Sequence, residues 1–175
     1  PWLIEAMLQV PILRRISDWT GGLVAKFLIY NGVLYFWHIP YMYDLALAVH
    51  NLHIVEHLGF MSTAIISWVG VLCSAPSLPR AHPGKQLIYL FAMMLPMKVL
   101  GAIITLSDRL IYQGYADAPR VFGLSPMQDQ AWGGLLMWLP GGIVMIGSMM
   151  IVFSRWWQQE KEEQLRVISG GQESP

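Results

Sequence analysis

The sequence is poor in charge and in cysteine. Only 13% of its 175 residues are charged, about half of the roughly 25% that is usual in soluble globular domains. Eleven basic and eleven acidic residues cancel, so no net field attracts nucleic acid. A single cysteine, Cys73, excludes an internal disulfide, and its apolar surroundings predict a packing role. A secretory signal is also missing, because no small-residue cleavage site follows the first long apolar run.

Long apolar runs are what the sequence has instead. Hydrophobic residues make up 55% of the chain, and the mean hydropathy is +0.46. A helix needs about 20 mostly apolar residues to cross a bilayer. We predict four spanning helices, at about 20–39, 53–75, 85–106 and 130–153. The predicted fold class is therefore an all-α, polytopic transmembrane helix bundle.

Shorter segments lie before and between these runs. Residues 1–17 carry apolar side chains at nearly helical spacing, which predicts an interfacial amphipathic helix. Pro40 ends the first span, and 41–50 are predicted to form a short surface or re-entrant helix. Three prolines force a loop at 74–84, and a longer connection with glycines and prolines covers 107–127.

The sequence also predicts where the fourth spanning helix begins and how the chain continues after it. Ser125 followed by Gln128 predicts a capping box, with Pro126 at the first helical position. We assign residues 1–157 to one transmembrane domain. The remaining residues, 158–175, are predicted to form a cytoplasmic tail that continues the helix with polar residues and ends in disorder.

The distribution of lysine and arginine predicts the orientation of the chain. One side of the predicted topology holds Arg14, Arg15, Arg80, Lys85, Arg155, Lys161 and Arg166, and the other holds Arg109 and Arg120. Cytoplasmic loops carry the excess of positive residues, so this seven-to-two split predicts that both ends of the chain are cytoplasmic. Because the chain begins at Pro1 rather than at methionine, we also expect further sequence upstream.

Most of the histidines fall at the predicted outer ends of the spans, together with several carboxylates. These residues are His38, His50, His53 and His57, beside Glu56, Asp108 and Asp129. His53 and His57 are four residues apart, so one helix face presents both imidazoles. Such a pair is a common clamp for a metal ion, which lies about 2 Å from each ring nitrogen. The gathering predicts metal binding; the alternative is that these histidines lie in the wet interface and hydrogen-bond to loops.

Lys98 is predicted to lie deep in the third span, where a charge is costly. One interpretation is a polar pathway, or a patch of neighbouring methionine sulfurs that suits Cu(I). The interpretation that we favour is an internal ion pair, with Glu56 as a candidate partner and the methionines packed around a kink at Pro96.

Two other metal chemistries fit parts of the pattern. His53, Glu56 and His57 match the H-x-x-E-H signature of some zinc proteases, but chance matches to so short a pattern are frequent, and a third ligand would be needed. A bis-histidine haem is restricted to one outer layer, because His82 falls on the other side. We predict no catalytic activity.

Several short motifs occur in a fixed order at the ends of the predicted helices. They are Trp37-His38-Ile39-Pro40, then Tyr43-Asp44, then His53-x-x-Glu56-His57, then Asp129-Gln130-x-x-Gly133-Gly134, and finally Arg155-Trp156. Together they resemble the polytopic CtaG family, the assembly factors of caa-type cytochrome c oxidases. The resemblance covers most of the chain, from Pro1 to about Glu160.

The resemblance implies a multi-pass protein of the bacterial plasma membrane that helps to mature an oxidase, with copper handled at the outer face. It implies that the candidate metal ligands are His38, His53, His57 and Asp129. The implied partners are membrane lipid and oxidase subunits. Members of the family are generally longer, with upstream spanning helices and additional histidines that this chain does not show.

A second functional interpretation stays open from the sequence. The chain could be a structural subunit of a larger respiratory or photosynthetic membrane complex without retained metal activity, because function resides in a site and not in a fold. Its low charge and its many aromatic residues suit a surface that packs against other membrane subunits.

Overall fold

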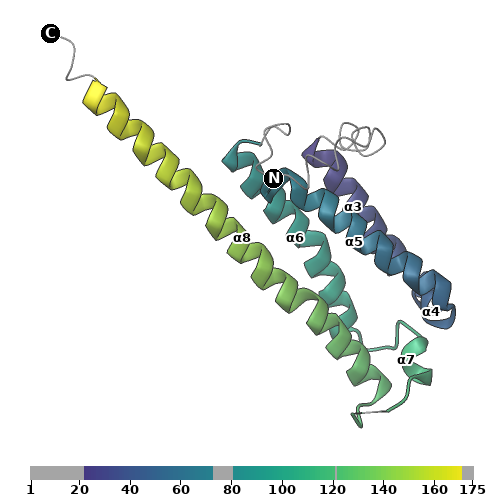
Figure 1. The fold of residues 1–175 in the computed structure, drawn as a ribbon. Helices are drawn as coiled ribbons and strands as arrows, with labels where there is room; N and C mark the ends of the chain where they lie inside the picture. The colour runs from purple at the N-terminus through teal and green to yellow at the C-terminus, as the bar shows by residue number, and fades with distance from the viewer. Residues whose placement is uncertain (1–21, 73–80, 121, 171–175) are drawn as a thin grey trace, which may run out of the picture.

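The computed structural model describes residues 22–72, 81–120 and 122–170. Every regular element in these ranges is a helix, and the order is α3 (Leu23–Trp37), α4 (Pro40–Ala48), α5 (His50–Leu72), α6 (Pro83–Leu106), α7 (Gly114–Asp117) and α8 (Pro126–Gly170) (Figure 1). The predicted all-α bundle is confirmed. The predicted interfacial helix at 1–17, Cys73 and most of the loop at 74–84 lie outside the described residues.

Three of the helices are long and apolar enough to cross a bilayer. The qualifying segments are His50–Val69, Pro83–Leu106 and Pro126–Ser169. The first predicted span forms α3, which is apolar but has 15 residues and is therefore about 22 Å long, less than the roughly 30 Å of a hydrocarbon core. Its start adjoins residues that the structure does not describe. Within the described ranges, the bundle thus contains three membrane-length helices and one shorter apolar helix.

The outward faces of these helices are apolar. Large side chains with most of their surface exposed include Val24 and Ile88, both at 72%, and Ile143 at 73%. Soluble proteins rarely expose contiguous apolar surface of this extent. A bilayer removes the cost of this exposure, which agrees with the membrane assignment from sequence.

The close contact between α6 and α8 depends on glycine. A Cβ atom added at Gly134 would lie 2.9 Å from the backbone nitrogen of Thr105 and 3.0 Å from the carbonyl oxygen of Gly101. A Cβ atom added at Gly101 would lie 2.7 Å from Cβ of Trp138. Small residues let transmembrane helix backbones approach closely. These two glycines therefore bring the two helices together along their length (Figure 1).

The start of α8 has the predicted capping box. The backbone N–H of Ser125 donates to Oε1 of Gln128 at 2.9 Å, and the backbone N–H of Gln128 donates to Oγ of Ser125 at 3.3 Å. This reciprocal pair satisfies two amide groups that a helix start leaves without partners. The polar extension predicted after the fourth span is also helical, and it continues α8 as far as Gly170.

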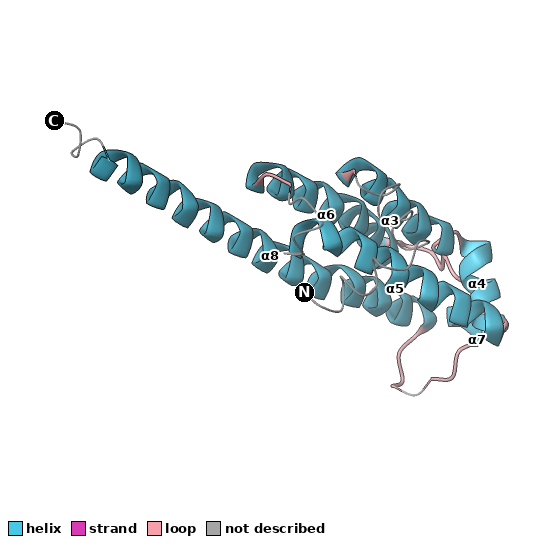
Figure 2. Ribbon diagram, turned by 45° about the horizontal axis from the view of Figure 1, so that its top comes forward, coloured by secondary structure: helices cyan, strands magenta, loops and turns pink. Residues whose placement is uncertain are grey.

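The two ends of the bundle differ in what they contain. The short helices α4 and α7, the first turns of α5 and the start of α8 lie at one end, which we call the histidine end (Figures 1 and 2). The starts of α3 and α6 lie at the other, which we call the opposite end, and α8 projects beyond the bundle there. The sequence-predicted metal residues are all near the histidine end.

Candidate metal site at the histidine end

Helix α5 holds His53 and His57 side by side. Their Nε2 atoms are 2.7 Å apart, and their rings stack with centroids 4.6 Å apart. The pair is exposed at the start of the helix. The prediction that one face presents both imidazoles is confirmed. When both Nε2 atoms are unprotonated, their lone pairs can point at one cation, whose distance to each nitrogen is about 2 Å. We call these two residues the histidine pair.

His38 follows the last turn of α3 and is half-buried. Its Nδ1 lies 2.7 Å from the carbonyl oxygen of Leu34. Since a carbonyl only accepts, Nδ1 carries the proton, and the lone pair of the neutral ring is on Nε2. The rings of Tyr43 and Phe60 lie beside it, with centroids 6.3 and 6.0 Å away.

The surroundings of His38 favour its neutral form. Burial lowers the pKa of His38, and the hydrogen bond to Leu34 and the charge of Glu56 offset part of this effect. Desolvation disfavours the charged imidazolium. His38 is therefore held in the protonation state that a metal ligand needs, with Glu56 near it.

Asp129 forms an ion pair with Arg120. Its Oδ2 lies 3.8 Å from Nη1 of Arg120, and Arg120 also donates to the carbonyl oxygens of Tyr115, at 2.5 Å, and Ala116, at 2.9 Å. Asp129 also lies in the first turn of α8, where a negative charge is favourable. This carboxylate therefore fixes the connection between α7 and α8.

The four predicted ligands do not meet at one point. Within the part of the chain that the structure describes, no three His, Cys, Asp or Glu side chains are close enough to hold one metal ion. His53 and His57 contact each other, His38 lies near Glu56, and Asp129 forms an ion pair with Arg120. Metal binding by these residues stays a prediction.

Gln130 organises the loop beside this site. Its side chain is fully buried, with 0% exposure. Its Oε1 accepts from the backbone N–H groups of Ile111 at 2.7 Å and Tyr112 at 3.2 Å, and its Nε2 donates to the carbonyl oxygen of Arg109 at 3.2 Å. One amide thus satisfies three backbone groups of a loop segment. The sequence placed Gln130 in a motif but did not reveal this role.

Asp44 makes the second connection to this loop. Its Oδ1 accepts from the backbone N–H of Gly114 at 2.9 Å, and its Oδ2 accepts from that of Gln113 at 3.1 Å. The carboxylate therefore binds the first turn of α7 to α4. Nothing in the spacing of the sequence pairs these residues, because 69 and 70 positions separate them.

Three tyrosines complete the network. Tyr112 donates to the carbonyl oxygen of His38 at 3.2 Å, and Tyr43 donates to the hydroxyl of Tyr115 at 3.1 Å. The rings of Tyr43 and Tyr112 are 4.1 Å apart. Burial raises the pKa of Tyr112 to about 12 and also raises that of Tyr43. Both hydroxyls therefore stay neutral donors, and they connect α4 and the loop to His38.

Lys98 lies against α8. Its Nζ donates to the carbonyl oxygen of Trp138 at 2.5 Å and lies 5.1 Å from the centroid of the Trp138 ring. Gly142 leaves the space that the amine occupies. The predicted internal ion pair is wrong, because Lys98 forms no ion pair with Glu56 or any other described carboxylate. A backbone carbonyl and an aromatic ring hold the cation instead.

Fold and site together define a class: a polytopic α-helical membrane protein with histidines and a loop network at one membrane face. A protein-family model described as cytochrome c oxidase caa3 assembly factor (Caa3_CtaG) matches residues 2–159. The match covers most of the chain, so the chain belongs to this family. Comparisons with curated proteins and with solved structures find no significant match.

Proposed function

We propose that this chain binds copper on the histidine pair and transfers it to a subunit of an oxidase during assembly. The observation that carries the proposal is the 2.7 Å separation of the Nε2 atoms of His53 and His57 on an exposed helix face. Imidazole nitrogen suits copper. Membership of the oxidase assembly factor family supplies the context in which copper is needed.

The small number of ligands suits transfer. Two histidines leave coordination positions open, and an open position is what an incoming ligand needs. A site closed by four protein ligands would release its ion slowly. His38 offers a third imidazole at the same end of the bundle, and its Nε2 carries the lone pair in the tautomer that the bond to Leu34 selects. We propose that His38 joins the coordination as the ion is loaded or released.

The distribution of lysine and arginine supports a role outside the cytoplasm. In the described residues the opposite end carries Lys85, Arg155, Lys161 and Arg166, and the histidine end carries Arg109 and Arg120. Since positive residues mark the cytoplasmic side, we propose that the histidine end faces outward. Copper would then be bound on the outer face, with both ends of the chain cytoplasmic.

Copper content tests the proposal directly. Protein purified in detergent is loaded with copper, and the bound metal is measured by elemental analysis after gel filtration. We expect copper on the unaltered chain and background values for the double variant with His53→Ala and His57→Ala. The matched control is His82→Ala, which removes an imidazole at the opposite end and should leave the copper content unchanged. Equal copper in all three proteins would contradict the proposal.

A co-purification measurement distinguishes this proposal from the alternative that the chain is a permanent structural subunit. A permanent subunit co-purifies with its complex at fixed stoichiometry, whether or not copper is present. An assembly factor associates with its oxidase partner transiently and is recovered mostly without it. Stable recovery of a defined complex with the double variant would favour the structural subunit.

A further inference from the structure

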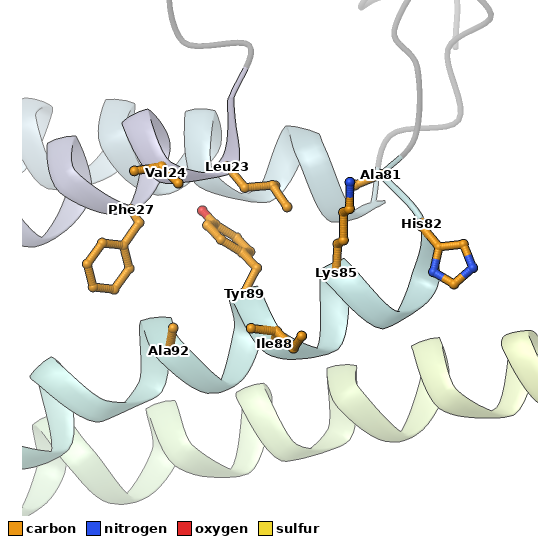
Figure 3. A pocket seen from close by; sticks show the side chains of 9 residues that line it. All are labelled: Leu23, Val24, Phe27, Ala81, His82, Lys85, Ile88, Tyr89 and Ala92. Carbon is orange, nitrogen blue, oxygen red and sulfur yellow. The ribbon is translucent and has the colours of Figure 1, made fainter.

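A cavity of about 680 Å³ lies between α3 and α6 at the opposite end. This volume is within the range of about 300 to 1,000 Å³ that is usual for small-molecule sites. Val24 and Phe27 of α3 line one wall, and Ile88 and Ala92 of α6 line the other. Figure 3 shows these side chains facing the space between the two helices.

One end of the cavity is polar. Lys85 and His82 lie there, at the start of α6, while the apolar residues extend away from them along the helix (Figure 3). His82 is the N-cap of α6, and Lys85 lies in the first turn of the helix. Ala92 is seven residues beyond Lys85, which corresponds to about 10 Å along the axis. The cavity is therefore amphipathic along its length.

Among the residues that the structure describes, no carboxylate forms an ion pair with Lys85. Lys85 is exposed at the start of α6. Nδ1 of His82 accepts from the backbone N–H of Gly84 at 3.2 Å. An acceptor nitrogen is unprotonated, so the neutral ring carries its proton on Nε2 and can donate from it. The polar end thus offers an ammonium group and an imidazole donor.

We propose that this cavity binds one anionic phospholipid. The phosphate lies against Lys85 and His82, and an acyl chain lies between α3 and α6 beside Phe27 and Ala92. Basic pockets between transmembrane helices at the membrane surface are suited to anionic headgroups. The lipid also covers apolar surface between the two helices.

A lipid fits the observations better than a soluble anion does. The walls are apolar, so a free phosphate at Lys85 would leave most of the cavity without a suitable occupant. Val24 and Ile88, which line the cavity, are each 72% exposed on the outward surface. The cavity therefore adjoins the surface that contacts the bilayer, and lipid can enter it from the side.

Photo-crosslinking tests the proposal. The intact chain is placed in phosphatidylcholine vesicles that contain a minor fraction of phosphatidylglycerol with a photoreactive acyl chain, and the adducts are located by peptide mass spectrometry. We expect adducts at Phe27, Ile88 and Ala92, more of them than with photoreactive phosphatidylcholine. Lys85→Gln should lower the labelling about fivefold, the effect of one cationic side chain near an anionic surface.

Two variants serve as controls. Lys85→Arg keeps the charge and should keep most of the labelling. Lys161→Gln removes an exposed lysine from the projecting part of α8, outside the cavity, and should leave the labelling unchanged.

Val24→Trp provides a second test of the site. It fills the cavity without altering charge and should lower the labelling at Phe27, so it tests the site even where the Lys85 variant folds poorly.

Three results would overturn the proposal. Equal labelling by the two photoreactive lipids would mean that the cavity takes any bilayer lipid. An equal loss in Lys85→Gln and Lys161→Gln would mean that net charge, and not this cavity, attracts the lipid. In a third case, added inorganic phosphate would abolish the preference for phosphatidylglycerol but leave the acyl-chain adducts in place. This result would mean that Lys85 binds a soluble anion.

Discussion

The histidine end and the opposite end are built from the same helices but held by different forces. At the histidine end, Gln130 and Asp44 hold a loop by hydrogen bonds to its backbone, and Tyr112 connects that loop to His38. At the opposite end, α3 and α6 leave a cavity with mostly apolar walls. The comparison teaches that hydrogen bonds connect the loop to His38 at one end, whereas mainly apolar side chains of two helices line the cavity at the other.

Replacement of Gln130 should give the largest effect, and it can be compared with a second glutamine at the same end. Gln130→Ala removes the acceptor of the backbone N–H groups of Ile111 and Tyr112, and we expect a loss of about 2 to 4 kcal/mol in the free energy of unfolding. Gln113→Ala, an exposed residue of the same loop, should change it by less than about 0.5 kcal/mol. Chemical unfolding in detergent measures both. Equal effects would mean that the buried amide does not hold the loop.

The glycines of α8 should show a similar contrast along one helix. Gly134→Ala places a Cβ against the backbone of α6, and we expect a loss of about 1 to 3 kcal/mol from overpacking. Gly147→Ala meets nothing within 4 Å, so it should be neutral or stabilise the helix by up to about 1 kcal/mol. Thermal unfolding of the two variants measures the difference. Destabilisation by both would show that helix flexibility matters and not close approach.

Two tyrosines allow a matched comparison of the ends. Tyr112 donates to the carbonyl oxygen of His38 at 3.2 Å, and Tyr89 donates to that of Ser67 at 3.3 Å. Replacing either by phenylalanine should cost about 1 kcal/mol in the free energy of unfolding. Only Tyr112→Phe should also lower the affinity for copper, measured by competition with a chelator, because only it adjoins His38. Equal loss of copper affinity in both variants would contradict the separation of the two ends.

The smallest expected effect concerns pH. Burial lowers the pKa of His38 in the folded protein. At pH values above about 6.5, the pKa of histidine in an unfolded chain, the ring is neutral in both the folded and the unfolded protein. As pH falls below that value, the unfolded chain takes up the proton first, so folding becomes less favourable.

His38→Gln provides the test of this effect. In the metal-free protein, the stability difference between about pH 7.5 and about pH 5.5, on either side of the histidine pKa, should be smaller in the variant than in the unaltered chain. Unfolding curves at both pH values measure it. The same pH dependence in both proteins would show that His38 is not desolvated.

Local spacing explains what could be predicted from the sequence. The histidine pair and the capping box of Ser125 with Gln128 involve residues three or four positions apart, for which helix geometry fixes the outcome. Run length likewise predicted the long helices α5, α6 and α8. These features need no knowledge of how distant segments pack.

The features that sequence did not reveal depend on backbone partners far along the chain. Asp44 and Gln130 bind amide groups of a loop that has no periodicity, and backbone groups carry no signal in the residue letters. The same limit explains Lys98. A carboxylate partner was expected, and the amine instead donates to the carbonyl oxygen of Trp138.

The most direct test of the copper proposal is X-ray absorption spectroscopy of the copper-loaded chain. We predict scattering from imidazole nitrogens at about 2 Å, lost in the double variant with His53→Ala and His57→Ala. Scattering dominated by sulfur would contradict the account, because it would place the metal at methionine sulfurs and away from the histidine pair.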